Sequence, residues 1–309
     1  MGSDDDKISK ILIVGLDQAG KTSILNILNQ KYNLMDNIKP TVNISRAEIK
    51  IIGIPIVCWD LGGQERFRKN FLKNLKVFEQ TDSLFYVVDA LNAVRYEESL
   101  QYYVDILKIF EQLKSKPKIV LCLHKIDPNL QNEPDTLNTI QQVKELFISR
   151  SNDYEVSTYV TSIYDRRSIV EAFSKNIQQL LTTLKPFKPI LESISLLLKL
   201  DAAILFDENL MILSDYYKNA EIEEVCLSTV YNSVFYITRT NPKLAESFTS
   251  NFELVLNVKN QKKLFNFTEI KFKGWNLYLL TMGDHKLDSK VVYAKFESLI
   301  HALEQQKSL

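Results

Sequence analysis

Short apolar runs alternate with longer segments of helical periodicity over the first 185 residues of the chain. Helical spacing of apolar residues is clearest from Leu100 to Phe110 and from Ile169 to Leu184. The apolar runs predict buried strands at Lys10–Val14, Ile56–Asp60, Leu84–Asp89, Lys118–His124 and Glu155–Thr161. Apolar strands separated by helices indicate an α/β domain, with a mostly parallel sheet and helices on both of its faces.

One strand is expected to run against the others. The segment Asn43–Ile52 precedes Gly53, and the strand that ends at Asp60 follows directly, so we predict an antiparallel edge strand joined through a turn at Gly53. Ligands of such sheets bind at the carboxyl ends of the parallel strands. This rule groups Asp60, the glycine-rich segment after Val14 and the segment after Leu123 around one crevice.

The segment Lys185-Pro186-Phe187-Lys188-Pro189 is typical of a domain boundary. Beyond it the pattern predicts an α+β domain in the order αββαβββα. Its expected elements are Ile190–Lys199, Ala202–Phe206, Leu210–Tyr217, Glu221–Arg239, three strands near Phe252–Val258, Leu264–Phe272 and Trp275–Met282, and the helix Ser289–Glu304. We therefore expect an acidic segment at 1–9, the α/β domain at 10–185, a linker at 186–189 and the second domain at 190–309.

The middle helix of the second domain is apolar nearly all round. Its apolar residues are Ile222, Val225, Cys226, Leu227, Val230, Tyr231, Val234, Phe235 and Ile237. Such a helix is buried on two sides, and its own sheet can cover only one of them. A second domain of the same kind is expected to cover the other, which predicts a dimer through 190–309. Coverage by the first domain or by the last helix is the alternative.

Composition limits the class of protein. The 309 residues are 45% hydrophobic and 25% charged, which suits two globular domains. Because Lys+Arg and Asp+Glu both number 38, no nonspecific nucleic-acid binding is expected. The spacing of Cys58, Cys122 and Cys226 suits neither a metal site nor a disulfide framework, and indicates reduced thiols in a cytoplasmic protein. No signal segment or lipidation motif is evident, so we expect membrane contact only through partners.

Residues 15–22 read Gly-Leu-Asp-Gln-Ala-Gly-Lys-Thr, a complete phosphate loop placed between a strand and a helix. Backbone N–H groups of such a loop cradle phosphates, aided by the helix dipole. Lys21 supplies a mobile charge, and the Thr22 hydroxyl can bind Mg²⁺. A chance glycine turn is the alternative, which the flanking strand and helix argue against. The expected nucleotide-binding residues here are Gly15, Asp17, Gln18, Ala19, Gly20, Lys21, Thr22 and Ser23.

The segment Asp60-Leu61-Gly62-Gly63-Gln64 leaves a predicted strand at the same edge. Asp60 can hold Mg²⁺, Gly63 lets the backbone approach a terminal phosphate, and Gln64 can orient an attacking water. Thr41 can complete the Mg²⁺ shell when a γ-phosphate is present, which would couple nucleotide state to loop order. Ordinary turns are the alternative for both segments. The expected catalytic residues are Gln64, Lys21 and Thr41, and the metal ligands Thr22, Thr41 and Asp60.

A third group of residues predicts which base is bound. Asp127 follows the fourth buried strand, and its carboxylate can accept hydrogen bonds from the N1–H and exocyclic amine of guanine but finds no N1 donor on adenine. The stem of Lys125 would lie along the base. His124 is either part of this site or a strand-end histidine without a ligand. Ser162 and Ile163 can turn backbone N–H groups toward the base oxygen.

These residues together resemble a small GTPase over about residues 8–185. The phosphate loop and Trp59-Asp60-Leu61-Gly62-Gly63-Gln64 are similar to the Arf family. His124-Lys125-Ile126-Asp127 and Thr161-Ser162-Ile163-Tyr164-Asp165 resemble the Rag (Gtr) GTPases, in which His replaces the usual Asn of Asn-Lys-x-Asp. The order of elements after Pro189 resembles the roadblock domain of the Rag proteins. Two departures matter: His124 cannot offer both groups of an Asn amide, and the amphipathic N-terminal helix of Arf proteins is absent.

The resemblance implies a switch that binds GTP or GDP with Mg²⁺ and hydrolyses GTP slowly. No arginine in the chain is placed by its motif to act on the phosphates, so activating and exchange factors are expected, and a homodimer or heterodimer through the roadblock-like domain. A nucleotide-binding scaffold with little or no hydrolysis is the alternative, and an ATPase is disfavoured by Asp127. The basic residues after Gln64 are expected to form a solvated helix face: Arg66, Arg68, Lys69, Lys73 and Lys76.

Overall fold

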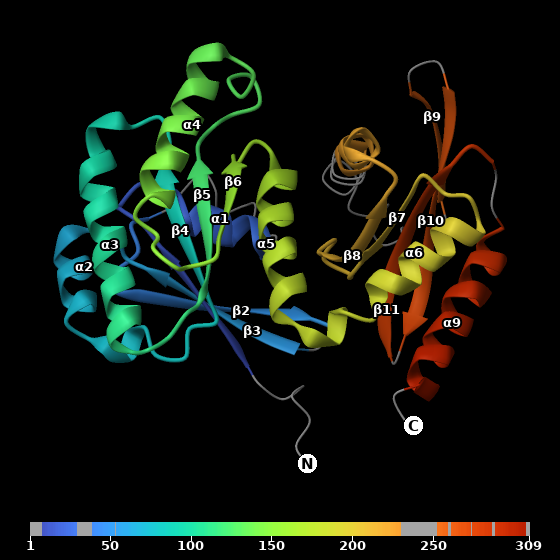
Figure 1. Cartoon of the computed structure of the whole chain (residues 1–309), viewed down its shortest axis with the longest axis horizontal. Coiled ribbons are helices and arrows are strands. Elements are labelled where there is room, and N and C mark those ends of the chain that lie inside the picture. Colours follow the sequence, from blue (N-terminus) through green and yellow to red (C-terminus); the bar gives the residue numbers. More distant parts are fainter. Residues whose placement is uncertain are drawn as a thin grey trace. The chain divides into compact units, whose positions relative to one another are not determined.

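The computed structural model describes residues 8–29, 39–52, 54–229, 252–258, 261–272, 274–285 and 288–306. The chain divides into two compact units, Met1–Asn176 and Ile177–Leu309 (Figure 1). The division falls within α5 (Arg166–Leu180). Each unit contains one sheet with its own helices.

The first unit contains a six-stranded sheet in the order β2-β3-β1-β4-β5-β6. Its strands are β1 (Ser9–Val14), β2 (Ile44–Ile51), β3 (Ile54–Leu61), β4 (Ser83–Asp89), β5 (Lys118–His124) and β6 (Val156–Thr161). All neighbours run parallel except β2, which lies antiparallel to β3 at the edge. The mostly parallel sheet and the antiparallel edge strand are therefore confirmed. Gly53, at the expected turn, lies outside the described residues.

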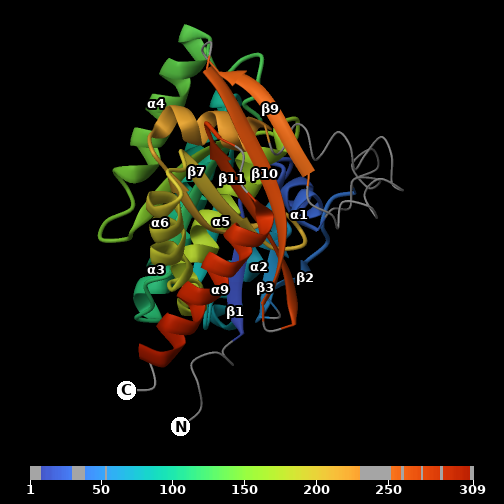
Figure 2. The same ribbon diagram turned by 90° about the vertical axis from the view of Figure 1, so that its right-hand side faces the viewer.

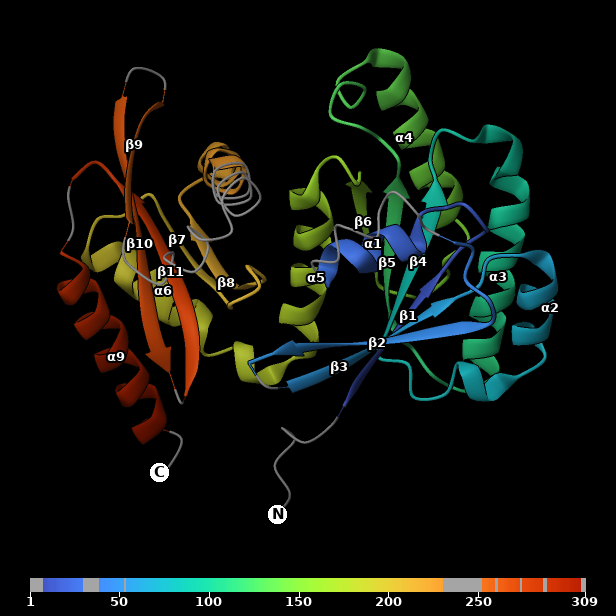
Figure 3. The same ribbon diagram turned by 180° about the vertical axis from the view of Figure 1, so that it is seen from behind.

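Helices cover both faces of this sheet (Figures 1 and 3). They are α1 (Lys21–Leu28), α2 (Glu65–Leu72), α3 (Tyr96–Gln112), α4 (Pro134–Ile148) and α5, with short 3-10 turns at Leu75–Val77, Ala93–Arg95 and Thr182–Leu184. Because consecutive strand residues point to opposite faces, Tyr86 and Phe85 reach different helices. Tyr86 packs 4.9 Å from Tyr103 of α3, whereas Phe85 packs 5.7 Å from Phe173 of α5, measured between ring centroids.

The second unit contains a five-stranded antiparallel sheet in the order β8-β7-β11-β10-β9, of which Figure 2 labels β7, β11, β10 and β9. Its elements are α6 (Phe187–Leu197), β7 (Ala202–Phe206), β8 (Ile212–Tyr217), a helical segment at 220–229, β9 (Phe252–Val258), β10 (Gln261–Phe272), β11 (Trp275–Gly283) and α9 (Ser289–Gln306). Helices α6 and α9 pack together through stacked rings of Phe187 and Phe296, 6.4 Å apart. The order agrees with the predicted one over the described residues; positions 230–239 of the expected middle helix lie outside them.

Helix α6 begins earlier than expected. Residues 187–189, predicted as linker, form its first turn. Proline is compatible with that turn because the first N–H groups of a helix have no acceptor within it.

Within the residues that the structure describes, no helix is both long and apolar enough to cross a membrane.

Candidate functional site

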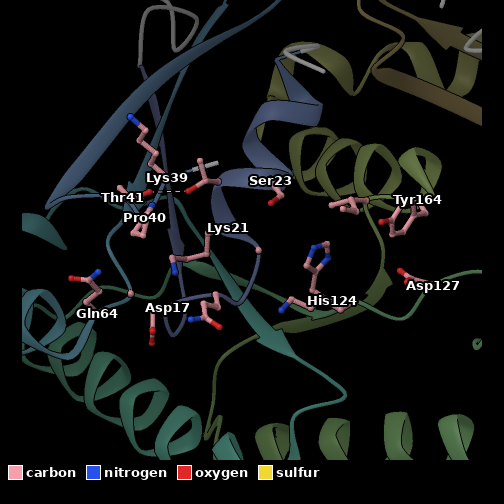
Figure 4. Close-up of a pocket in the computed structure, with 16 residues that line it drawn as sticks. Asp17, Lys21, Ser23, Lys39, Pro40, Thr41, Gln64, His124, Asp127 and Tyr164 are labelled. Atoms are coloured by element: carbon pink, nitrogen blue, oxygen red, sulfur yellow. Dashed lines mark hydrogen bonds between the residues drawn. The ribbon is translucent and has the colours of Figure 1, made fainter. Parts of the chain in front are cut away.

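A cavity of about 470 Å³ lies where the parallel strands of the first unit end (Figure 4). This volume is typical of small-ligand sites, which span about 300–1,000 Å³. The cavity is lined by Asp17, Gln18, Gly20, Lys21, Thr22, Ser23, Lys39, Pro40, Thr41, Gly63, Gln64, His124, Lys125, Asp127, Ile163 and Tyr164. Most predicted site residues are in this set. The others, Gly15, Ala19, Asp60 and Ser162, are themselves buried and support the lining.

The phosphate loop folds around the ammonium group of Lys21. Its Nζ donates hydrogen bonds to the carbonyl oxygens of Gly15, at 3.0 Å, and Leu16, at 2.6 Å. The side chain is only 5% exposed, and burial lowers the pKa of Lys21 to about 8, although the nearby carboxylates of Asp60 and Asp17 act in the opposite direction. A phosphate bound at the loop would favour the charged form of Lys21, which burial disfavours.

The ring of His124 packs against the phosphate loop at Gly20. An added Cβ at Gly20, which has a φ of 99°, would lie 2.3 Å from His124 Cδ2, so only glycine fits there. On the other side of the ring, His124 Nδ1 lies 2.9 Å from Thr161 Oγ1. Burial lowers the pKa of His124 to about 4, so the ring is neutral at neutral pH. His124 therefore links the phosphate loop to the end of β6 without adding charge.

Three oxygen-bearing side chains converge beside the loop. Thr22 Oγ1 donates to Asp60 Oδ2 at 2.6 Å, Thr41 Oγ1 donates to the same oxygen at 3.0 Å, and the two hydroxyl oxygens are 2.8 Å apart. Asp60 is fully buried, its Oδ1 has no hydrogen-bond partner, and burial raises its pKa. A buried, unpartnered carboxylate oxygen next to two hydroxyls fits Mg²⁺, which prefers oxygen ligands.

Gly63 brings the segment after β3 against the phosphate loop. Its carbonyl oxygen accepts a hydrogen bond from Asp17 N at 3.1 Å, and an added Cβ would lie 2.2 Å from that nitrogen. Gln64 follows as the N-cap of α2 and lines the cavity. Its Oε1 accepts a hydrogen bond from Arg66 Nε at 3.2 Å. The predicted water-orienting residue thus lies beside the phosphate end of the site, near Lys21 and Asp17 in Figure 4.

Asp127 lies at the opposite end of the cavity (Figure 4). Its Oδ1 accepts a hydrogen bond from Ser162 Oγ at 2.5 Å. The Ser162 amide, expected to face the base, instead donates to Ser168 Oγ at 3.2 Å, so it is the hydroxyl of Ser162 that contacts Asp127. Lys125, with a φ of 71°, is held by an ion pair of 2.8 Å between its Nζ and Asp89 Oδ2.

Sequence patterns did not indicate every lining residue. Lys39, Pro40 and Tyr164 also face the cavity. Tyr164 is 77% exposed and lies beside Asp127. It directly follows Ile163, which is predicted to contact the base, and this position is the feature of the sequence that could have indicated Tyr164. The solvated basic face expected after Gln64 is wrong for Arg68, which is 7% exposed, and holds for Arg66, Lys69, Lys73 and Lys76.

Comparison with known proteins identifies the family. The conserved region of the Gtr1/RagA G proteins matches residues 10–258, which includes most of the chain. The chain belongs to the Gtr1/RagA family. It is a small GTPase of the Rag/Gtr type, a nucleotide-binding switch that uses GTP and GDP with Mg²⁺ and hydrolyses GTP.

Individual relatives are distant. The chain is 24% identical to the GTP-binding protein gtr1 of Schizosaccharomyces pombe over 97% of this chain and 96% of that protein. It is 40% identical to the ADP-ribosylation factor-like protein alp41 of the same organism, but over only 29% of this chain and 45% of that protein. Among solved structures, the Arl6 BBS3 small GTPase from Trypanosoma brucei, with bound GppNp, matches 56% of this chain and 98% of its own at 17% identity and a TM-score of 0.46.

Proposed function

We propose that this GTPase is a slow switch whose loop before β2 responds to the nucleotide, and that it assembles with another chain through its second unit. The observation that carries the proposal is the position of Thr41. This residue comes from the loop, yet its hydroxyl contacts both Thr22 and Asp60 at the Mg²⁺ site. A ligand that recruits or releases Thr41 therefore changes the order of the loop.

The base end would select guanine through Asp127. A carboxylate accepts the N1–H and exocyclic amine of guanine, whereas adenine leaves an acceptor unpaired. Ser162 Oγ, which donates to Asp127 Oδ1, fixes the orientation of the carboxylate. The neutral ring of His124 and the stem of Lys125 complete this end of the cavity.

At the phosphate end, Gln64 would orient the attacking water, and Lys21 would stabilise charge on the transferred group. Thr22, Thr41 and Asp60 would hold Mg²⁺, which neutralises phosphate charge when bound. Slow hydrolysis is supported by Arg95, which does not line the cavity and whose guanidinium group is engaged by Asp17 and Glu98. An activating protein that supplies an arginine would accelerate the reaction, and an exchange factor would reload the switch.

Conversion of bound GTP to GDP tests this proposal. With Mg²⁺ present, we expect a half-time on the order of an hour for single-turnover conversion, as for small GTPases without an activator. Excess EDTA should release the nucleotide and stop conversion, because Asp60 and the two hydroxyls lose their shared ligand. Chromatography of bound and free nucleotide checks both results. GTP that survives for days in Mg²⁺ would instead support a scaffold.

Assembly through the second unit rests on the helical segment at 220–229. Cys226 and Leu227 are buried, with Cys226 Sγ 3.3 Å from Met282 Sδ of β11, whereas Ile222 and Val225 are only half-buried. A helix that places apolar side chains both toward its sheet and away from it suits a roadblock-like dimer. The partner would be a second copy or a related chain, in the cytoplasm or at a membrane surface reached through partners.

Analytical sedimentation tests the assembly. The full chain at tens of micromolar is expected to sediment with twice the mass of one chain, or to do so once a related partner is added. Changing the half-buried Val225 to Glu should return it to the mass of one chain without loss of nucleotide binding, because the cavity lies entirely in the first unit. A single-chain mass both alone and with partner would overturn the proposal.

A further inference from the structure

Asp17 of the phosphate loop carries an ion pair that no motif predicts. Arg95, in the 3-10 turn after β4, donates from Nη2 to Asp17 Oδ1 at 2.6 Å and from Nη1 to the Asp17 carbonyl oxygen at 3.0 Å. The same guanidinium group donates from Nε to Glu98 Oε2, in the first turn of α3, at 3.1 Å. Arg95 therefore bridges the loop and α3.

Glu98 has a second arginine partner, which contacts the other side of the site. Glu98 Oε1 accepts a hydrogen bond from Arg68 Nη2, and Arg68 Nε donates to the carbonyl oxygen of Gly63 at 2.8 Å. That carbonyl oxygen also accepts from Asp17 N, at 3.1 Å. The contacts close into a ring that passes through Asp17, Gly63, Arg68, Glu98 and Arg95. Glu98 is the only member of this ring that both arginines contact.

Three charged side chains of the ring are partly exposed, at 28% for Arg95, 35% for Asp17 and 43% for Glu98, whereas Arg68 is buried. Exposed pairs contribute little to stability, because water screens them and long side chains lose entropy. The Arg68 side chain is only 9% exposed, lies over the ring of Tyr102, and ends on a backbone carbonyl that must stay close to the loop. Its position is therefore coupled to Gly63, the residue next to Gln64.

Charge explains why Arg95 is needed. The Asp17 carboxylate lies close enough to raise the pKa of Lys21, and it lines the cavity beside Gly63 and Gln64. A terminal phosphate in that region would be repelled by an unpaired carboxylate. Arg95 neutralises Asp17, and Glu98 keeps Arg95 in place. Loss of this neutralisation would therefore weaken binding of the triphosphate, which carries the terminal phosphate, and not of the diphosphate.

From this geometry we infer that Glu98 is a positioning residue for the terminal phosphate and for Gln64. It holds Arg95 on Asp17 and Arg68 on Gly63, so that the phosphate loop and the segment after β3 stay together when GTP is bound. The inference rests on the proposed slow hydrolysis, but it also predicts a difference in nucleotide release that needs no hydrolysis.

The test compares the full-length Glu98→Ala protein with wild type and with Glu97→Ala. Glu97 is an exposed carboxylate in the same helix turn, so its removal has the same effect on charge and on the helix dipole. We expect Glu98→Ala to slow single-turnover GTP hydrolysis about tenfold, because small displacements of reacting groups cost one to two orders of magnitude. Glu97→Ala is expected to match wild type.

Release of fluorescent nucleotides, with Mg²⁺ present, provides the second measurement. Glu98→Ala should release a non-hydrolysable GTP analogue several times faster than wild type while releasing GDP at the wild-type rate. Equal acceleration of both nucleotides would mean that Glu98 merely stabilises the fold, and no acceleration of either would remove it from the site; each overturns the inference. If wild type does not hydrolyse GTP, the proposed slow hydrolysis fails, and the release ratio alone decides the role of Glu98.

Discussion

Replacing Asp127 by asparagine is expected to lower the affinity for GTP and GDP about 10⁴-fold, the discrimination typical of a site whose buried polar groups lose their partners. The asparagine keeps one acceptor but presents an N–H₂ group to the exocyclic amine of guanine. Two donors then face each other in a partly closed cavity. The hydrogen bond from Ser162 Oγ to Oδ1 holds the side chain in this orientation, so it cannot simply turn away.

The same substitution should create affinity for xanthine nucleotides, since xanthine carries a carbonyl where guanine carries the amine. Competition against labelled GTP and labelled xanthosine triphosphate measures both changes. Ser162→Ala is the matched control: it removes the support but not the acceptor, and a much smaller loss is expected. Unchanged GTP affinity in the Asp127→Asn protein would place the base elsewhere.

Replacing Gln64 by leucine should slow GTP hydrolysis by about a hundredfold or more, because a positioned group that assists proton transfer or orients water contributes at least that much. Leucine has nearly the same volume, and Gln64 is the N-cap of α2 without a side-chain capping bond, so the fold should be kept. GTP affinity should change little. Single-turnover hydrolysis and nucleotide dissociation, measured on the same preparation, separate the two effects.

Gln141→Leu provides the control for this substitution, since Gln141 is an exposed residue of α4 outside the cavity. A hydrolysis rate that is the same in wild type and in Gln64→Leu would remove Gln64 from the mechanism. The role of the Gln64 side chain would then be limited to accepting the hydrogen bond from Arg66 Nε.

Much of the site could be predicted because its residues lie at fixed places in a repeating pattern. Gly15 to Thr22 follow β1, Asp60 lies at the end of β3, and Asp127 follows β5. A parallel sheet alone therefore brings them to one edge. The predicted bounds of the strands agree with the observed bounds within a few residues for the same reason. Apolar runs of this length are typical of strands that are buried on both faces of such a sheet.

The ring around Glu98 could not be predicted, since no local pattern encodes it. Arg95 is 78 residues from Asp17 in the sequence, and Arg68 is 30 residues from Glu98. Arg68 stands among basic residues that are exposed, and only the packing of α2 against α3 shows that it is buried. Likewise, no local pattern shows that the Ser162 amide donates to Ser168 Oγ while the Ser162 hydroxyl donates to Asp127.

The edge strand β2 has a consequence for the solubility of the folded chain. On one side β2 pairs with β3, and no strand of the described sheet follows it on the other. A free strand edge can template further strands and lead to aggregation. Arg46, Glu48 and Lys50 place exposed charges along this strand. These charges disfavour the addition of a further strand at this edge, and with it open-ended stacking of one sheet on the next.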